Sequence, residues 1–441
     1  MRIRKYSQNF ILFIGFLFLM SCAEQRVQKQ ELAEIMKTSL HSNLLDAWYP
    51  VTVDSLYGGF LADFAYDRQA DGPQNKMIVT QTRHVWTASR AAMFFDQQAY
   101  RDIAEHGYHF LREKMWDDVY GGFYTIRDRS GQAVSSRYGD EKMAYGHAFA
   151  IYALSSYYDM SGDSSALDLA KRTFNWLEEH SHDPEYGGYF DRLHRDGSWV
   201  KDPLWKDQNS SIHLLEAFTA LYALWPDDLL RERLHEMLLV IRDRIVANKS
   251  YLTLFLQRDW TPISFRDSTE AVRRENYHYD HVSFGHDVET AYLMLEASHA
   301  LGLEADVETQ NIAKKMVDHA LANGWDDNNG GFYYEGYYYN DVDSCTIIND
   351  AKSWWVQAEG LNVLLLMSQL YPGEAKYQSA FLKQWEYIDR FLIDHQHGGW
   401  YTAGLDTRPQ STLSDKASNW KVNYHNARAL MNCYHMLTSG H

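Results

Sequence analysis

Apolar residues recur with helical periodicity along nearly the whole chain after residue 30, and polar residues occupy the opposite faces of the same segments. This pattern predicts twelve helices, and breaks such as Ser161-Gly162-Asp163 separate some of them. The expected helices cover residues 31–48, 82–95, 98–115, 142–160, 164–180, 208–224, 229–247, 285–301, 306–322, 352–371, 375–394 and 422–438. No linker or change in composition divides this region, so we expect a single domain over residues 31–441.

Five of the longer connections share the motif Asp-x-x-x-Gly-Gly-aromatic. The copies begin at Asp54, Asp117, Asp183, Asp326 and Asp394, at intervals of 63, 66, 143 and 68 residues. Because the third interval is about twice the others, we expect a sixth, eroded copy near Asp259. A repeat of this period indicates that each copy contributes one supersecondary unit.

Six helix pairs, with long and short connections in alternation, predict an all-α (α/α)6 toroid or barrel of twelve helices with long rim loops. The even-numbered helices would line the inside and the odd-numbered helices the outside. The glycine pairs would form tight turns in the long loops, since glycine tolerates backbone conformations that other residues avoid.

The first turns of the even-numbered helices carry distinctive side chains. The set comprises Arg83, His147, His213, His286, Trp354, Trp355, Trp420 and His425. If these helices run parallel, the side chains converge at one mouth of the barrel. Helix N-termini and an arginine would stabilise an oxyanion there, and histidines are bases near neutral pH. Such a ring suits removal and return of a proton beside a sugar carbonyl, with tryptophan rings holding the sugar.

His286 and Glu289 lie three residues apart at the start of one expected helix. Their Cβ atoms should then be about 5–6 Å apart on one helix face. A carboxylate at that position can hold one ring nitrogen and determine which nitrogen carries the proton. We therefore expect His286 to act as a general base supported by Glu289.

From about residue 31 to 438 the chain resembles the N-acylglucosamine 2-epimerase superfamily, most closely its cellobiose 2-epimerase branch. The motifs that carry the resemblance are Tyr145-Gly146-His147-Ala148-Phe149, His213-Leu214-Leu215-Glu216-Ala217, Ser283-Phe284-Gly285-His286-Asp287-Val288-Glu289, Trp354-Trp355-Val356-Gln357-Ala358-Glu359 and Tyr424-His425-Asn426-Ala427-Arg428. The resemblance implies an (α/α)6 barrel and a sugar 2-epimerase. Such an enzyme interconverts C2 epimers of a reducing-end aldose through an enediolate, without a metal or another cofactor.

The resemblance also implies roles for individual residues. His286 and His425 would be the two bases on either face of C2, with Glu289 polarising His286. His213 would help to open the sugar ring, and Arg83 would bind the enediolate oxygens. The expected substrate-binding residues are Tyr145, His147, Asn209, Trp354, Trp355, Glu359 and Trp420, of which Trp355 and Trp420 match sugar-stacking positions.

Other functions stay open at this point. An aldose–ketose isomerase of the mannose isomerase type would use the same scaffold and return the proton to C1 instead of C2. An (α/α)6 glycoside hydrolase would need two carboxylates about 5–10 Å apart, drawn from such residues as Asp287 and Glu289. A glycan-binding protein would use the aromatic residues but not the histidines. His278 and His281 precede His286, but no regular ligand spacing supports zinc, so no metal is expected.

The N-terminus indicates export. Basic residues, the apolar run 10–20 and Leu19-Met20-Ser21-Cys22 form a signal peptide over residues 1–21 with a lipobox-like end. We expect acylation of Cys22, a tether over residues 22–30, and a lipid-anchored protein of the cell envelope, on the periplasmic or outer-membrane face.

Charge and cysteine usage narrow the partners. A net charge of −17 disfavours nucleic acid and anionic membrane, so membrane contact is expected only through the lipid. Cys345 and Cys433 do not make a disulfide framework. The expected partner is a mono- or oligosaccharide substrate, for a monomer or a dimer.

Overall fold

The computed structural model describes residues 27–49, 51–136, 138–201, 203–303, 306–339 and 344–439. The predicted signal peptide and Cys22 lie outside the described residues. Residues 27–30, which we expected in the tether, are helical. None of the described helices has the length and apolar character needed to cross a bilayer.

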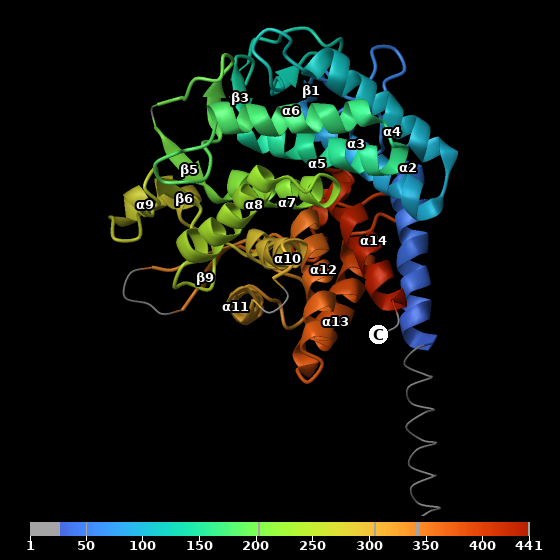
Figure 1. The fold of residues 1–441 in the computed structure, drawn as a ribbon. Helices are drawn as coiled ribbons and strands as arrows, with labels where there is room; N and C mark the ends of the chain where they lie inside the picture. Colours follow the sequence, from blue (N-terminus) through green and yellow to red (C-terminus); the bar gives the residue numbers. More distant parts are fainter. Residues whose placement is uncertain are drawn as a thin grey trace, which may run out of the picture.

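Six helices form an inner ring in which each helix contacts the next, and the last contacts the first (Figure 1). They are α3 (Ile78–Phe95), α5 (Ala144–Ser161), α7 (Gln208–Leu224), α10 (Phe284–Ala300), α12 (Trp354–Leu370) and α14 (Tyr424–Thr438). These helices are apolar on nearly all sides, as expected of elements that pack on both the axis and an outer layer.

The outer layer consists of amphipathic helices that bury one face against the inner ring. It contains the helix over residues 27–38 with η1 (Ser39–Leu45) and α2 (Asp46–Trp48), α4 (Gln98–Phe110) with η2 (Leu111–Met115), α6 (Ser164–His180), α8 (Asp228–Val240) with η3 (Ile241–Val246), α11 (Val307–Asn323) and α13 (Ala375–Phe391). The N-terminal helix lies beside α14 and completes the circle (Figure 1). The predicted (α/α)6 barrel is confirmed, and one hydrophobic core runs through it.

The rim loops contain short antiparallel strands that the helical periodicity does not predict. The pairs are β1 (Lys76–Met77) with β2 (Ile126–Arg127), β3 (Glu141–Met143) with β4 (Arg192–His194), β5 (Trp205–Asp207) with β6 (Phe255–Gln257), and β7 (Val282–Ser283) with β8 (Glu335–Tyr337), which also pairs with β9 (Thr346–Asn349). The loops also hold three short helices, α9 (Glu270–Asn276), η4 (Tyr277–Tyr279) and η5 (Pro409–Leu413). Since β1, β3, β5 and β7 each run directly into an inner helix, the rim pairing fixes where those helices begin.

Each full copy of the rim motif is closed by a buried ion pair. A lysine near the start of the inner helix reaches back to the motif aspartate, and both side chains are buried. The pairs are Lys76–Asp54, Lys142–Asp117, Lys206–Asp183, Lys352–Asp326 and Lys416–Asp394. Burial alone would raise the pKa of Asp54, but Arg129 and Lys76 outweigh it and hold that pKa below its usual range. The lysines are thus part of the repeat, although they lie beyond the Asp-x-x-x-Gly-Gly-aromatic motif.

The glycine pair of each copy has positive φ angles, and at Gly122 the space is also closed. Its φ is +69°, and a Cβ atom there would lie 2.6 Å from Nε2 of His147 and 2.9 Å from the Trp176 ring. Any side chain at this position would therefore displace the loop from the inner helix.

The sixth copy does not lie at Asp259, and that expectation was wrong. In a full copy, the Tyr124 N–H donates to the carbonyl of Met115 at 2.8 Å, and the same bond joins Thr253 to Ile245 at 3.0 Å. The sixth copy therefore occupies residues 247–252, shortened and without a glycine pair. Asp259 lies in the following hairpin turn, where its side chain accepts from the Thr261 N–H at 3.0 Å. With the Asp and both glycines lost, spacing alone pointed to the wrong turn.

Candidate active site

The first turns of the inner helices meet at the rim-loop end of the barrel, as the repeat predicts. Most of the predicted residues form one continuous cluster there. The Trp355 ring lies between two imidazoles, with centroid distances of 4.7 Å to His286 and 5.8 Å to His425. Across the mouth, the Tyr145 ring is 5.2 Å from His213 and 6.2 Å from Trp420.

Three imidazoles in this cluster are each held through Nδ1. His425 Nδ1 is 2.7 Å from Glu359 Oε1, and His213 Nδ1 is 2.9 Å from Glu216 Oε2. Because a carboxylate accepts, it favours a proton on Nδ1 and leaves the lone pair on Nε2. His286 Nδ1 is 2.7 Å from Ser283 Oγ. Within the described part of the chain, none of the three Nε2 atoms has a hydrogen-bond partner, so each is free to exchange a proton with a ligand.

Burial keeps the imidazoles of His286 and His425 neutral. Loss of hydration lowers the pKa of His286 to about 3, and His213 and His281 act in the same direction. Burial also lowers the pKa of His425 well below its usual value, with Arg83 and Arg428 adding to the effect. Both imidazoles are therefore unprotonated near neutral pH and are available as bases.

Glu289 is not the partner of His286, contrary to the sequence expectation. Its Oε1 accepts from Arg428 Nη2 at 2.6 Å and lies 3.9 Å from His425 Nδ1. The two residues do lie three apart on α10, but Glu289 reaches the barrel axis while His286 stays with Ser283 at the helix start. The hydrogen-bond support of His286 is thus a hydroxyl from its own N-cap residue.

Arg428 is the centre of the charge network beneath the imidazoles. Its guanidinium bonds Glu216, Glu289 and Glu359, the last two at 2.6 and 2.8 Å. Burial raises the pKa of Glu289 and of Glu359 to about 7. Burial acts the same way on Glu216, but Arg428 and His213 outweigh it and lower that pKa to about 2.

Oxygens of Glu289 and Glu359 and a nitrogen of His425 lie within 4.8 Å of one another, as a metal site would require. In this structure the guanidinium of Arg428 bonds both carboxylates, so an organic cation already supplies the positive charge at that point. The donor set therefore fits an ion-pair network better than a metal centre.

The remaining predicted residues surround the mouth. Arg83 donates to the Tyr145 hydroxyl at 2.9 Å and to the Trp420 carbonyl at 3.2 Å, and its guanidinium lies over the Phe149 ring. Burial raises the pKa of Tyr145, and the nearby Asn209 side chain acts in the opposite direction. Trp420 is 44 % exposed, which places an aromatic face at the entrance. Trp354 instead packs beside Lys421 Nζ, 5.5 Å from its ring centroid.

His147 lies apart from this cluster, and its contacts give no support to a role in substrate binding. Its Nε2 accepts from the Phe123 N–H at 2.9 Å, and its Nδ1 donates to the Met143 carbonyl at 2.7 Å. The ring stacks on Trp176 at 4.4 Å. In other copies Gln81 and Gln357 accept the same backbone N–H, so His147 occupies the position that anchors the rim loop.

The sequence prediction missed Arg428 and Glu216 as site residues, although both lie within the quoted motifs. Each follows a site histidine by three residues, at His425 and His213. On a helix this spacing places the two side chains on one face. A charged residue three positions after the histidine was therefore a signal in the first turns that carry His213, His286 and His425.

Comparison with known proteins agrees with this geometry. The family model of N-acylglucosamine 2-epimerase matches residues 58–429. A cellobiose 2-epimerase from Bacteroides fragilis is 29% identical over 90% of this chain and 97% of its own. A D-mannose isomerase from Marinomonas mediterranea is 25% identical over 88% and 93%. The solved cellobiose 2-epimerase of Bacillus thermoamylovorans superposes with a TM-score of 0.80 at 24% identity, over 92% of this chain and 99% of that one.

The protein has an (α/α)6 barrel with an imidazole cluster at its rim-loop end, and its relatives are cellobiose 2-epimerases and mannose isomerases. It is therefore a carbohydrate epimerase or isomerase. The chain belongs to the N-acylglucosamine 2-epimerase family.

The anchoring role of His147 can be tested by substitution. His147→Ala should lower the free energy of unfolding by about 2 kcal/mol, since it leaves the buried Phe123 N–H without an acceptor. His147→Gln should recover most of this loss, because glutamine serves the same purpose in two sister copies. Urea unfolding measures both. A variant of unchanged stability that loses more than about tenfold in kcat/KM would instead place His147 in catalysis.

Proposed function

We propose that this protein is a sugar 2-epimerase that interconverts the C2 epimers of a reducing-end aldose, in a mono- or oligosaccharide. The observation that carries the proposal is the pair His286 and His425. Both lie against Trp355, both are held through Nδ1, and both are kept neutral by burial. A sugar stacked on Trp355 would then present its C2 between two free Nε2 atoms.

In the proposed reaction one imidazole removes the proton from C2 of the open-chain aldose. The C2–H electron pair moves into the C1–C2 bond, and the carbonyl oxygen becomes part of an enediolate. Arg83, together with the N-termini of the inner helices, stabilises that negative charge. The second imidazole takes up a proton from solvent when the sugar binds and returns it to the opposite face of C2. The first imidazole releases to solvent the proton that it removed, before the next turnover. The step is neutral in electrons and protons, so it calls for no redox carrier.

We assign assistance in ring opening to His213 and its carboxylate Glu216. An imidazole with its Nδ1 proton held by a carboxylate can pass a proton between the anomeric hydroxyl and the ring oxygen through Nε2. Tyr145, Asn209 and Trp420 are then the groups available to orient the sugar around C2.

A second candidate, an aldose–ketose isomerase, is favoured by the D-mannose isomerase relative from Marinomonas mediterranea. It differs only in where the proton returns, C1 instead of C2. Proton NMR of the protein in D2O with mannose, glucose and short β-linked disaccharides separates the two. Deuterium at C2 of an epimeric product supports the epimerase, and a ketose with deuterium at C1 supports the isomerase. Release of new reducing ends without exchange would contradict both.

We further propose that the protein works at the cell envelope, anchored through acylated Cys22. The support is the sequence Leu19-Met20-Ser21-Cys22 after an apolar run. Labelling of the wild type but not of Cys22→Ala by a palmitate analogue would agree, and recovery of both in the soluble fraction would not.

A further inference from the structure

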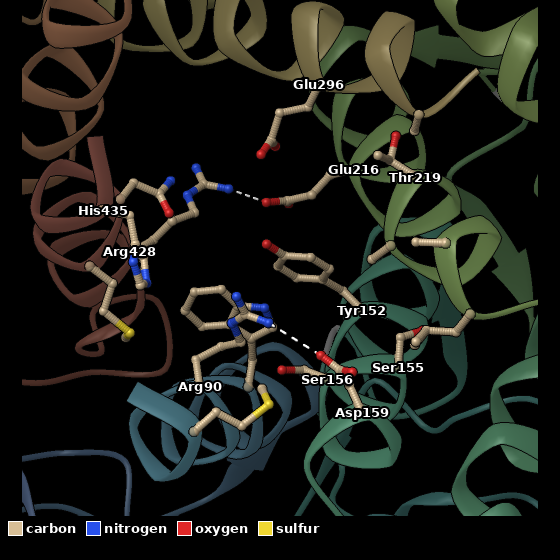
Figure 2. Close-up of a pocket in the computed structure, with 18 of the residues that line it drawn as sticks. Arg90, Tyr152, Ser155, Ser156, Asp159, Glu216, Thr219, Glu296, Arg428 and His435 are labelled. Carbon is tan, nitrogen blue, oxygen red and sulfur yellow. Dashed lines mark hydrogen bonds and ion pairs between the residues drawn. The ribbon is translucent and has the colours of Figure 1, made fainter. Parts of the chain in front are cut away.

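A cavity lies at the opposite end of the barrel from the imidazole cluster. Its volume is about 500 Å³, and its lining comes from the middle and C-terminal parts of α3, α5, α7, α10 and α14 (Figure 2). Asp159, Glu296, His299 and His435 are exposed at its mouth. Glu216 and Arg428 form its floor, so the charge network of the active site separates the two ends.

We propose that this cavity binds an organic ammonium ion with an apolar body, and that Glu296 receives the charged group. The proposal does not depend on the reaction carried out at the other end of the barrel. Five inner helices end around the cavity, and the C-terminus of a helix carries a partial negative charge that favours cations.

Glu296 is the carboxylate in this cavity without a matching cation. It accepts a hydrogen bond from the Tyr292 hydroxyl, which Asn432 also contacts at 3.0 Å. Within the described residues it forms no ion pair with a lysine, arginine or histidine. The two arginines that line the cavity are already engaged. Arg428 forms ion pairs with three glutamates, and Arg90 Nη1 lies 3.5 Å from Asp159 Oδ2 (Figure 2).

The other walls suit the body of such a ligand. Trp86 stacks on Tyr152 at 5.3 Å, and Phe94 and Met431 extend the apolar surface. The hydroxyls of Ser155 and Ser156 are buried on the same wall, and neither has a hydrogen-bond partner in the part of the chain that the structure describes. A hydroxyl can accept from an ammonium N–H, so the cavity offers acceptors in addition to the carboxylate.

Calorimetric titration of the full chain with n-hexylammonium chloride tests this, with n-hexanol as the uncharged match and ionic strength held constant. The amine should bind saturably with one site and at least about tenfold more tightly than the alcohol, as expected for a charge-assisted hydrogen bond. Glu296→Gln should weaken amine binding by about tenfold. Glu232→Gln, at an exposed position on outer helix α8, should leave binding unchanged.

Two further variants decide the location. Ala220→Phe fills the cavity and should abolish amine binding, and it decides the matter if Glu296→Gln does not fold. Trp355→Ala, in the imidazole cluster, should leave amine binding intact. Equal affinity for the alcohol, no effect of Glu296→Gln, or binding that survives Ala220→Phe but not Trp355→Ala would each overturn the proposal.

Discussion

Replacing either His286 or His425 by alanine should lower the rate of sugar epimerisation by roughly a thousandfold, the scale of a lost general base. The barrel should stay folded in both variants, because neither imidazole supports the rim loops. His286 bonds only its own N-cap serine, and His425 only carboxylates that Arg428 also holds. Progress curves give the rates, and urea unfolding checks the fold.

The same variants test whether each base serves one face of C2. Each single variant keeps one imidazole, so it should still exchange the C2 proton of one epimer with D2O while failing to convert it. The two variants should exchange opposite epimers. His278→Ala is the matched control, since His278 is exposed in the rim loop and contacts neither base. Exchange of the same epimer by both variants, or turnover close to that of the wild type, would contradict the two-base assignment.

The barrel could be predicted from the sequence because each residue of the repeated motif has a specific structural role. The glycine pair needs positive φ, and the aspartate before it needs a buried cation, so the copies persist as a readable pattern. The sixth copy had lost both features, and only its backbone hydrogen bonds reveal it. The rim strands were missed because two to four residues carry no usable periodicity.

The site was predicted less completely because local sequence does not show which residues of different helices form hydrogen bonds and ion pairs across the barrel. His286 and Glu289 have the right spacing for a pair, but Glu289 accepts a hydrogen bond from Arg428 of α14 and His286 bonds Ser283. His147 illustrates the converse. Rim loops of different length shift the register, so a histidine at the expected spacing from the glycines falls at the loop anchor instead of the mouth. Equivalent positions in the copies are identified by their hydrogen bonds to the rim loop and not by the number of residues after the glycine pair.

Arg428→Met should have the largest effect on stability, a loss of about 3–5 kcal/mol at neutral pH. The substitution leaves Glu216, Glu289 and Glu359 buried together without the guanidinium that bonds all three. It should also suppress activity, because Glu216 and Glu359 hold Nδ1 of His213 and His425. Arg428→Lys keeps the charge but not the fork that reaches several carboxylates, so its loss should be intermediate.

The pH dependence distinguishes a charge effect from a packing effect. The pKa values of Glu289 and Glu359 are raised to about 7 by burial, above the value of about 4.3 in an unfolded chain. Such groups favour the folded state when protonated, so their stabilising contribution is complete at low pH and is lost as the pH rises toward 7. Removing Arg428 should raise these pKa values further. The stability difference between the wild type and Arg428→Met, measured by urea unfolding, should therefore be larger at pH 8 than at pH 5. A difference that does not change with pH would mean that Arg428 stabilises the barrel by packing alone.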